Sequence, residues 1–396
     1  MTRAAFLKSL IESTNLNIIF QLTDKCVLSC KYCFAKGAHK NNLSTFKIDV
    51  LEKAIKQAFE TRHNHVAFEW TGGEPLLIGV EFFKQVVLLQ KKYATKPYDN
   101  GVQTSGYHFD TELLDFLLEN DFSISTTIDG TEEIHNLNRP ANGNIPSFEK
   151  VQRTRKYIMG KGKNCGFITT VTKNNLGHEK EMLDFFRELK SHSFHSNPYI
   201  YFSKNEVKDC TIALTNEDYA KYFISQFNVW CESGKVEPIP QTVDYILQCL
   251  SSEKPSNNTI CTFGGRCFTN FIALTPNGDA YNCPKFTGSQ NMILGNINQQ
   301  EIKDILSPKS EAMNRMINER LEAINKCKSK KCKFFYICNG GCPYYSFVNS
   351  NGESLKECDY LCEGKMLIYK YLKDVVKILK SKDDYFERKL EKQQTE

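Results

Sequence analysis

The stretch CVLSCKYC at residues 26–33 holds three cysteines within eight residues, and it decides which fold and chemistry the chain is expected to have. It follows a short apolar run at 17–22, and no fourth cysteine lies near Cys26, Cys30 and Cys33. Three thiolates around an iron–sulfur cube leave one iron open, and an open metal position is where a substrate or cofactor binds. The spacing alone also allows a zinc site completed by a distant residue, or three unrelated buried thiols.

The chain around this stretch alternates between apolar runs and amphipathic segments, which is typical of βα units around a parallel sheet. Strands are expected at 17–22, 65–70, 100–104, 122–129, 166–171 and 198–202, and helices at 46–61, 81–93, 111–119, 147–159 and 179–190. These units predict an α/β fold, a partial (β/α)6 barrel. In such barrels the chemistry lies on loops at the carboxyl ends of the strands, where CVLSCKYC stands.

A second unusual stretch, WTGGEP at 70–75, ends the second expected strand. Two glycines permit a close backbone approach, and a carboxylate suits an ammonium group. Together with the cysteine triplet, this stretch makes the chain resemble the radical S-adenosylmethionine (radical SAM) enzymes. The resemblance implies a 4Fe–4S cluster on Cys26, Cys30 and Cys33 that binds S-adenosylmethionine through its open iron, and a methionine amino group received by Gly72, Gly73 and Glu74.

Two further stretches extend the resemblance. Tyr32 stands where the family places an aromatic ring beside the adenine. The segments STTIDG at 125–130 and HNLNR at 135–139 are similar to the family stretch that holds the cofactor carboxylate and ribose, which implies Thr127 and Arg139 as contacts. Asp129, directly before a glycine, is interpreted as a turn residue in preference to a catalytic base.

Nine of the 16 cysteines lie between residues 261 and 362. Zinc ribbons would need similar thiolates and turns, and the spacing alone does not separate them from iron sites. The radical SAM resemblance upstream favours iron, and the pattern resembles the SPASM extension, which carries two auxiliary 4Fe–4S clusters. It implies ligands Cys261, Cys267, Cys283 and Cys342 for the first, and Cys327, Cys332, Cys338 and Cys362 for the second, with Cys358 as the alternative fourth ligand.

The expected organisation has four parts. Residues 1–232 form the radical SAM partial barrel, 233–260 a linker with a short helix, 261–370 the SPASM auxiliary-cluster domain, and 371–396 a charged C-terminal helix or tail.

Composition excludes several classes of protein. Lys and Arg outnumber Asp and Glu by only 51 to 46 over 396 residues, far from the basic surface of a nucleic-acid-binding protein. No run approaches the roughly 20 apolar residues of a membrane span. The residues before Cys26 lack a signal-peptide pattern, and many cysteines without a secretory signal indicate metal or redox chemistry in a reducing compartment, so a cytoplasmic protein is expected.

Enzymes of this layout mostly modify peptides, so the resemblance implies an oxidoreductase that uses a 5′-deoxyadenosyl radical on a polypeptide. Two reactions compete: maturation of a ribosomally made precursor peptide, giving a carbon crosslink or thioether with loss of two hydrogens, and anaerobic sulfatase maturation, which converts Cys or Ser to formylglycine. Sulfatase-maturating enzymes carry an aspartate base directly after the cysteine that corresponds to Cys283, whereas Pro284 stands here. Precursor-peptide maturation is therefore ranked first, and the base is unassigned. A non-catalytic metal or redox sensor is the remote alternative.

The expected partners are the peptide or protein substrate and an external electron donor such as flavodoxin or ferredoxin. Only 25 residues precede Cys26, too few for a leader-peptide-binding module. Recognition is therefore expected through a separate leader-binding protein or through β-augmentation on this chain.

Overall fold

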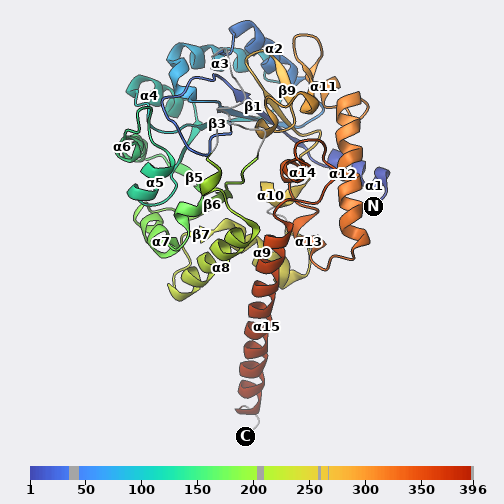
Figure 1. The fold of residues 1–396 in the computed structure, drawn as a ribbon. Helices are drawn as coiled ribbons and strands as arrows, with labels where there is room; N and C mark the ends of the chain where they lie inside the picture. Colours follow the sequence, from blue (N-terminus) through green and yellow to red (C-terminus); the bar gives the residue numbers. More distant parts are fainter. Residues whose placement is uncertain (35–43, 203–208, 257–259, 266, 394–396) are drawn as a thin grey trace.

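The fold is built on one curved sheet, seen in a computed structural model that describes residues 1–34, 44–202, 209–256, 260–265 and 267–393, with side chains up to 378 (Figure 1). In these residues the strand order is β10-β9-β8-β1-β2-β3-β4-β5-β6-β7. The strands are β1 (Asn15–Gln21), β2 (His65–Thr71), β3 (Tyr98–Gln103), β4 (Phe122–Thr127), β5 (Cys165–Val171), β6 (Ser193–Pro198), β7 (Ile239–Pro240), β8 (Phe271–Leu274), β9 (Asp279–Tyr281) and β10 (Ile293–Asn296).

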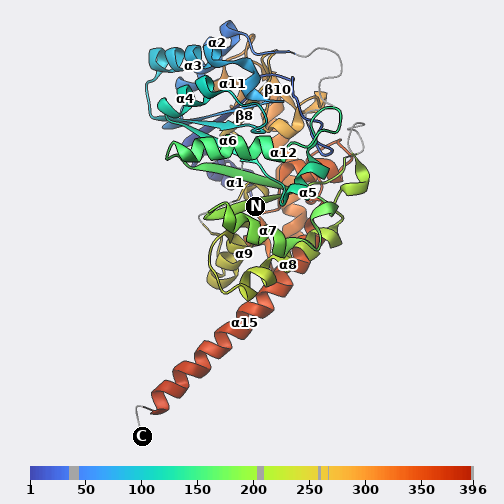
Figure 2. The same ribbon diagram turned by 90° about the vertical axis from the view of Figure 1, so that its left-hand side faces the viewer.

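Strands β1 to β7 are parallel and follow one another in chain order, which is the predicted partial barrel. The helices of this part lie on the outside of the curve (Figure 2). They are α2 (Ile48–Phe59), α3 (Val80–Tyr93), α4 (Thr111–Glu119), α5 (Glu132–Asn138), α6 (Phe148–Gly160), α7 (Glu179–Glu188), α8 (Asn216–Glu232) and α9 (Gln241–Ser252), with α1 (Arg3–Ile11) before β1.

Local sequence explains these elements. In α2, the buried residues Val50, Leu51, Ala54, Ile55 and Ala58 recur at helical spacing and face the sheet. Helix α8 begins with a capping box in which the Thr215 hydroxyl and the third helical residue satisfy each other's backbone N–H groups. The buried side chains of β1 and β2 are aliphatic near the start of each strand and aromatic near its end, where the rings of Phe20 and Trp70 stack with centroids 4.6 Å apart.

The sixth strand differs from the prediction. The apolar run 198–202 was the expected strand, but β6 is the more polar segment Ser193–Pro198. Tyr199, Ile200 and Phe202 are buried beyond the strand end, and the Tyr199 N–H still bonds to the Val171 carbonyl. The strong apolar signal therefore comes from chain packed over the barrel mouth, while β6 carries polar side chains toward the barrel interior.

The cysteine-rich region continues the same sheet. Strand β8 pairs with β1 in parallel, and β9 and β10 add antiparallel strands beyond it. These three strands were absent from the prediction. The helices here are α10 (Cys261–Gly264), α11 (Ile302–Ile305), α12 (Glu311–Ser329), α13 (Phe335–Cys338), α14 (Pro343–Asn349) and α15 (Cys362–Gln393), with short 3-10 turns including η4 (Pro284–Phe286).

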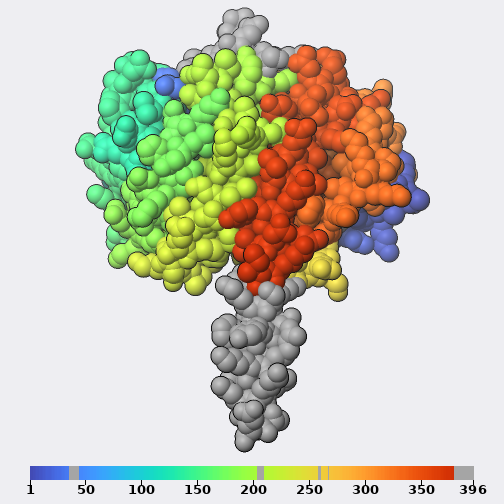
Figure 3. All heavy atoms as spheres, turned by 60° about the horizontal axis from the view of Figure 1, so that its bottom comes forward, coloured from blue at the N-terminus to red at the C-terminus, as the bar shows by residue number. Residues whose placement is uncertain are grey.

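Helix α15 begins at Cys362, nine residues before the predicted C-terminal helix or tail at 371–396, and its far end extends away from the body (Figures 1 and 2). Its first part packs against α8 and α9. In the space-filling view it runs between the yellow-green surface of α8 and the orange surface of the cysteine-rich region (Figure 3). No helix within the described ranges has the length and apolar character to cross a membrane.

Candidate active site and cluster sites

A cavity of about 370 Å³ opens at the carboxyl ends of the barrel strands. Its lining includes nearly all of the residues predicted around the first cluster: Cys26, Cys30, Tyr32, Cys33, Gly72, Gly73, Thr127 and Arg139. The fold therefore gathers residues from the ends of β1, β2 and β4 and from the segment after α5 around one space. Glu74 does not line the cavity.

The three-cysteine loop is held by the segment that follows α5. The Ser29 and Lys31 N–H groups bond to the carbonyls of Pro140 and Asn138, at 2.8 and 3.0 Å. Burial raises the pKa of Cys26 to about 11 and that of Cys30 to about 12, so both thiols stay protonated at neutral pH in the metal-free chain. A metal must displace these protons, and three thiols that line one cavity supply the donor type and number for a cluster with one open iron.

The two glycines after β2 serve a contact between loops. Gly72 has a φ of +138°, and a Cβ there would lie 2.6 Å from the Thr23 carbonyl oxygen. A Cβ on Gly73 would collide with the Lys25 carbonyl oxygen. The turn after β2 therefore packs against the backbone leading into Cys26, while both glycines also face the cavity.

Glu74 is fully buried behind the cavity wall. Its carboxylate accepts hydrogen bonds from the Thr104 hydroxyl at 2.6 Å, from the Ser105 N–H at 2.9 Å and from the Ser105 hydroxyl. These bonds attach the loop after β3 to the glycine turn. The contact with a methionine amino group stays a prediction, and a structural task for this carboxylate was not foreseen.

Tyr32, Asp129 and Arg139 form a buried chain of polar contacts. The Tyr32 hydroxyl donates to Asp129 Oδ2 at 2.6 Å and accepts from Arg139 Nη1 at 2.6 Å. Burial raises the pKa of Asp129, and the Arg139 charge and the Tyr32 hydroxyl oppose part of that rise. Asp129 is therefore more than a turn residue, since it fixes the ring expected beside the adenine. Arg139 keeps a buried Nε without a hydrogen-bond partner among the described residues.

The first predicted auxiliary site gathers Cys261, Cys267, Cys283 and Cys342. Burial raises the pKa of Cys261 to about 11 and that of Cys283 to about 12. The negative charge of a neighbouring cysteine of the set, in its thiolate form, adds to each rise. Burial raises the pKa of Cys267 as well, with contributions from the other three. The four thiols are thus mutual neighbours.

The surroundings of Arg320 indicate that an anionic group fits at this site. It is fully buried and donates to neutral acceptors: the Gly341 carbonyl at 2.7 Å, the Asn339 carbonyl at 3.3 Å and the Ser346 hydroxyl at 3.2 Å. Within the described ranges it has no carboxylate partner, and its Nε is unsatisfied. A buried cation without a counter-ion is costly, and thiolates around a cluster would supply the missing negative charge.

Five cysteines gather at the second predicted site: Cys327, Cys332, Cys338, Cys358 and Cys362. The sulfurs of Cys327 and Cys358 lie 3.9 Å apart. Burial raises the pKa of Cys362 to about 11, and Cys338, Cys358 and Cys332 add to the rise. Because both Cys358 and Cys362 adjoin the set, the choice of the fourth ligand stays a prediction.

Residues missed by the sequence analysis connect the cavity to the first auxiliary site. Lys285, Tyr344 and Tyr345 line the cavity, and Lys285 Nζ lies 5.4 Å from each ring centroid. All three stand within three residues of Cys283 or Cys342, and that proximity was the available signal. Asn197, near the end of β6, and Tyr199, just beyond that strand, complete this wall.

Comparison with known proteins agrees with this geometry. The model of the radical SAM superfamily matches residues 20–186, and the SPASM model, an iron–sulfur cluster-binding domain, matches 266–333. The chain is 29% identical over 359 residues to a cysteine-type anaerobic sulfatase-maturating enzyme of Clostridium perfringens, covering 87% of this chain and 93% of that protein. It is 27% identical to a serine-type enzyme of Bacteroides thetaiotaomicron, covering 93% and 90%.

Solved structures give the same picture. Native anSMEcpe with bound AdoMet superposes with a TM-score of 0.79 at 26% identity, covering 91% of this chain and 99% of that one. Streptococcus suis SuiB bound to S-adenosylmethionine has a TM-score of 0.62 at 18% identity, over 91% of this chain and 80% of that one, which is a likeness of fold.

Proposed function

Because this chain belongs to the radical SAM superfamily and carries a SPASM iron–sulfur domain after its barrel, we propose that it oxidises a Cys or Ser side chain of a protein or peptide to formylglycine. The observation that carries the proposal is the similarity to sulfatase-maturating enzymes of both types along nearly the whole of each chain. This reverses the order suggested by Pro284, which ranked precursor-peptide maturation first.

The proposed division of labour follows the cavity. Cys26, Cys30 and Cys33 would hold the first cluster, and Gly72, Gly73, Thr127, Tyr32 and Arg139 would surround S-adenosylmethionine. When bound, the cofactor supplies the radical that removes a hydrogen atom from the substrate. The protein holds the substrate side chain beside it and limits the access of water. We further propose two auxiliary clusters, on the cysteines predicted for them, and an external donor such as flavodoxin or ferredoxin.

The proton acceptor differs from the aspartate expected after Cys283. Pro284 has no side chain that accepts a proton, and Asp24 is the only carboxylate among the described residues that line the cavity. We propose Asp24 as the first residue to test for this role. Its carboxylate also accepts a hydrogen bond from the Ser44 hydroxyl at 2.7 Å, which fixes its orientation.

The test is an anaerobic assay. The reconstituted protein is expected to hold about 12 irons, since three cubes carry four each. With dithionite and S-adenosylmethionine, sulfatase-derived peptides containing Cys or Ser should stimulate 5′-deoxyadenosine formation and yield an aldehyde that a hydrazide reagent traps. A peptide product that has lost two hydrogens but carries no aldehyde would instead support the second candidate, precursor-peptide crosslinking, which Pro284 favours.

A further inference from the structure

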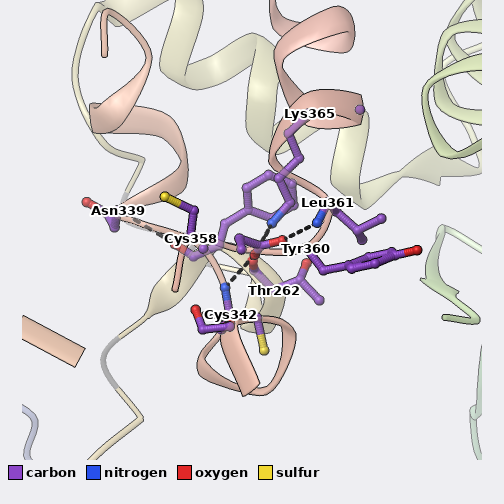
Figure 4. A network of polar contacts seen from close by, with 12 residues as sticks. Thr262, Asn339, Cys342, Cys358, Tyr360, Leu361 and Lys365 are labelled. Carbon is purple, nitrogen blue, oxygen red and sulfur yellow. Dashed lines mark hydrogen bonds and ion pairs between the residues drawn. The ribbon is translucent and has the colours of Figure 1, made fainter. Parts of the chain in front are cut away.

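A buried ion pair lies between the two predicted auxiliary sites. Lys365 Nζ is 2.9 Å from Asp359 Oδ2, and the two side chains are 2% and 5% exposed. Figure 4 shows the Lys365 side chain descending from α15 into the loop region that carries Cys342 and Cys358. The proposed function assigns no role to either residue.

The pair contacts the backbone at both sites. Asp359 Oδ2 accepts a hydrogen bond from the Cys342 N–H at 2.8 Å, and Lys365 Nζ donates to the Thr262 carbonyl, next to Cys261, at 3.0 Å. Cys342 and Cys261 belong to the first set. On the other side, Asp359 Oδ1 accepts from the Leu361 N–H at 2.8 Å, directly before Cys362 of the second set.

The Asp359 carboxylate occupies space that a side chain at position 341 would fill, and residue 341 is a glycine. Gly341 has a φ of +79°, and a Cβ there would collide with Asp359 Oδ2. The close approach lets the carboxylate reach the Cys342 N–H. Lys365 Nζ lies 4.5 Å from the Phe263 ring centroid, so aromatic carbon, and not water, covers part of the ammonium group.

The charges of the pair act on thiols of both sets. Burial raises the pKa of Cys261 and Cys338, and the Lys365 charge opposes the rise at each. Asp359 has the opposite effect at Cys338 and Cys362. Because both groups are buried, solvent screens their charges weakly.

We propose that Lys365 and Asp359 set the reduction potentials of the auxiliary clusters, Lys365 raising them and Asp359 lowering them. Reduction adds one electron, and therefore one negative charge, to a cluster, so a fixed neighbouring cation favours the reduced form and a fixed anion disfavours it. Both residues are positioning residues, since they act on the clusters through charge and through the backbone of ligand cysteines. The proposal rests on the auxiliary clusters of the proposed function.

The test uses the full chain with Cys26, Cys30 and Cys33 changed to Ala, so that only auxiliary clusters give EPR signals during a redox titration. Lys365→Met should lower the ratio of reduced to oxidised cluster about tenfold at a fixed potential, equivalent to about 59 mV for one electron. Asp359→Asn should raise that ratio, because it leaves the Lys365 charge uncompensated. Lys365→Arg should stay near the parent value. Lys92→Met, which removes a lysine from an exposed ion pair between α3 and α2, is the matched control.

Opposite shifts distinguish charge from structure. If the Met and Asn variants shift in the same direction, or neither shifts with full iron content, the proposal is wrong. If Lys365→Met cannot retain iron, the test rests on Asp359→Asn alone. An unchanged or lower ratio of reduced to oxidised cluster in that variant overturns the proposal. A parent protein without auxiliary iron would instead contradict the cluster assignment of the proposed function, and this proposal with it.

Discussion

At the scale of single residues, the absence of a side chain at Gly73 lets the turn after β2 pack against the loop that carries Cys26. Gly73→Ala would push its Cβ into the Lys25 carbonyl, one residue before Cys26. We expect this variant to lose the iron of the proposed first cluster, about a third of the iron of the three proposed cubes, and to keep that of the proposed auxiliary clusters. Iron and sulfide counts after reconstitution measure the loss. Gly160→Ala, where nothing lies within 4 Å of the added Cβ, is the control. Full iron in Gly73→Ala would contradict the expectation.

The buried thiols predict a pH dependence of the metal-free chain. Folding raises the pKa of Cys26 to about 11 and that of Cys30 to about 12, from an ordinary value of 9.0. The folded state therefore binds protons more tightly, and the stability this contributes is present below pH 9 and lost as pH rises toward the folded values. Thermal unfolding temperatures of iron-free protein should fall above pH 9. Reconstituted protein should show a smaller fall, because iron has already displaced these protons. An equal fall of the unfolding temperature with pH in iron-free and reconstituted protein would argue against iron binding by these thiols.

Much of the first site is predictable at this scale, and the polar network is not. Cys26 and Gly72 could be assigned to one cavity because motifs after parallel strands meet at one edge of the sheet, and Arg139 was added through the family resemblance. Asp129, Arg320 and Lys365 have no local signature. Asp129 contacts Tyr32 from 97 residues away, Arg320 contacts Gly341 from 21, and Lys365 contacts Thr262 from 103. Only the folded chain therefore reveals why these three side chains are buried.

At the scale of elements, the start of α15 places the last cysteine of the second site. Asn216 accepts a hydrogen bond from the Gly364 N–H at 2.8 Å and donates to the Tyr360 carbonyl at 2.9 Å, which ties α8 to both sides of Cys362. A Cβ on Gly364 would lie 2.5 Å from the Asn216 carbonyl oxygen.

Gly364→Ala should therefore separate α15 from α8. We expect a loss of about 1–3 kcal/mol in unfolding free energy, as for other overpacked contacts, together with loss of the proposed second auxiliary cluster only. Chemical denaturation and iron counts measure the two effects. Stability equal to that of Gly160→Ala would show that the helices can accommodate the methyl group.

Secondary structure was predictable where the apolar period was clear, as in β1, β2 and α4. It failed at β6, because the segment Ser193–Pro198 is polar and the apolar run beside it packs without pairing as a strand. It also failed at β8, since four residues inside a cysteine-rich region give too short a pattern to identify a strand.

At the scale of the whole molecule, β1 lies between β2 and β8, so the barrel and the cysteine-rich region share one sheet. One cluster of buried residues extends from Phe6 to Leu372. We expect the iron-free protein to unfold in a single transition, because neither part can lose its half of this core without exposing the other. Ile272→Ala in β8, which removes a fully buried side chain, should cost about 2–5 kcal/mol. It should lower the transition of the fluorescence of Trp70 and Trp230, both in the barrel part, and that of far-UV circular dichroism by the same amount. A barrel transition unmoved by Ile272→Ala would mean that the two regions fold independently despite the shared sheet.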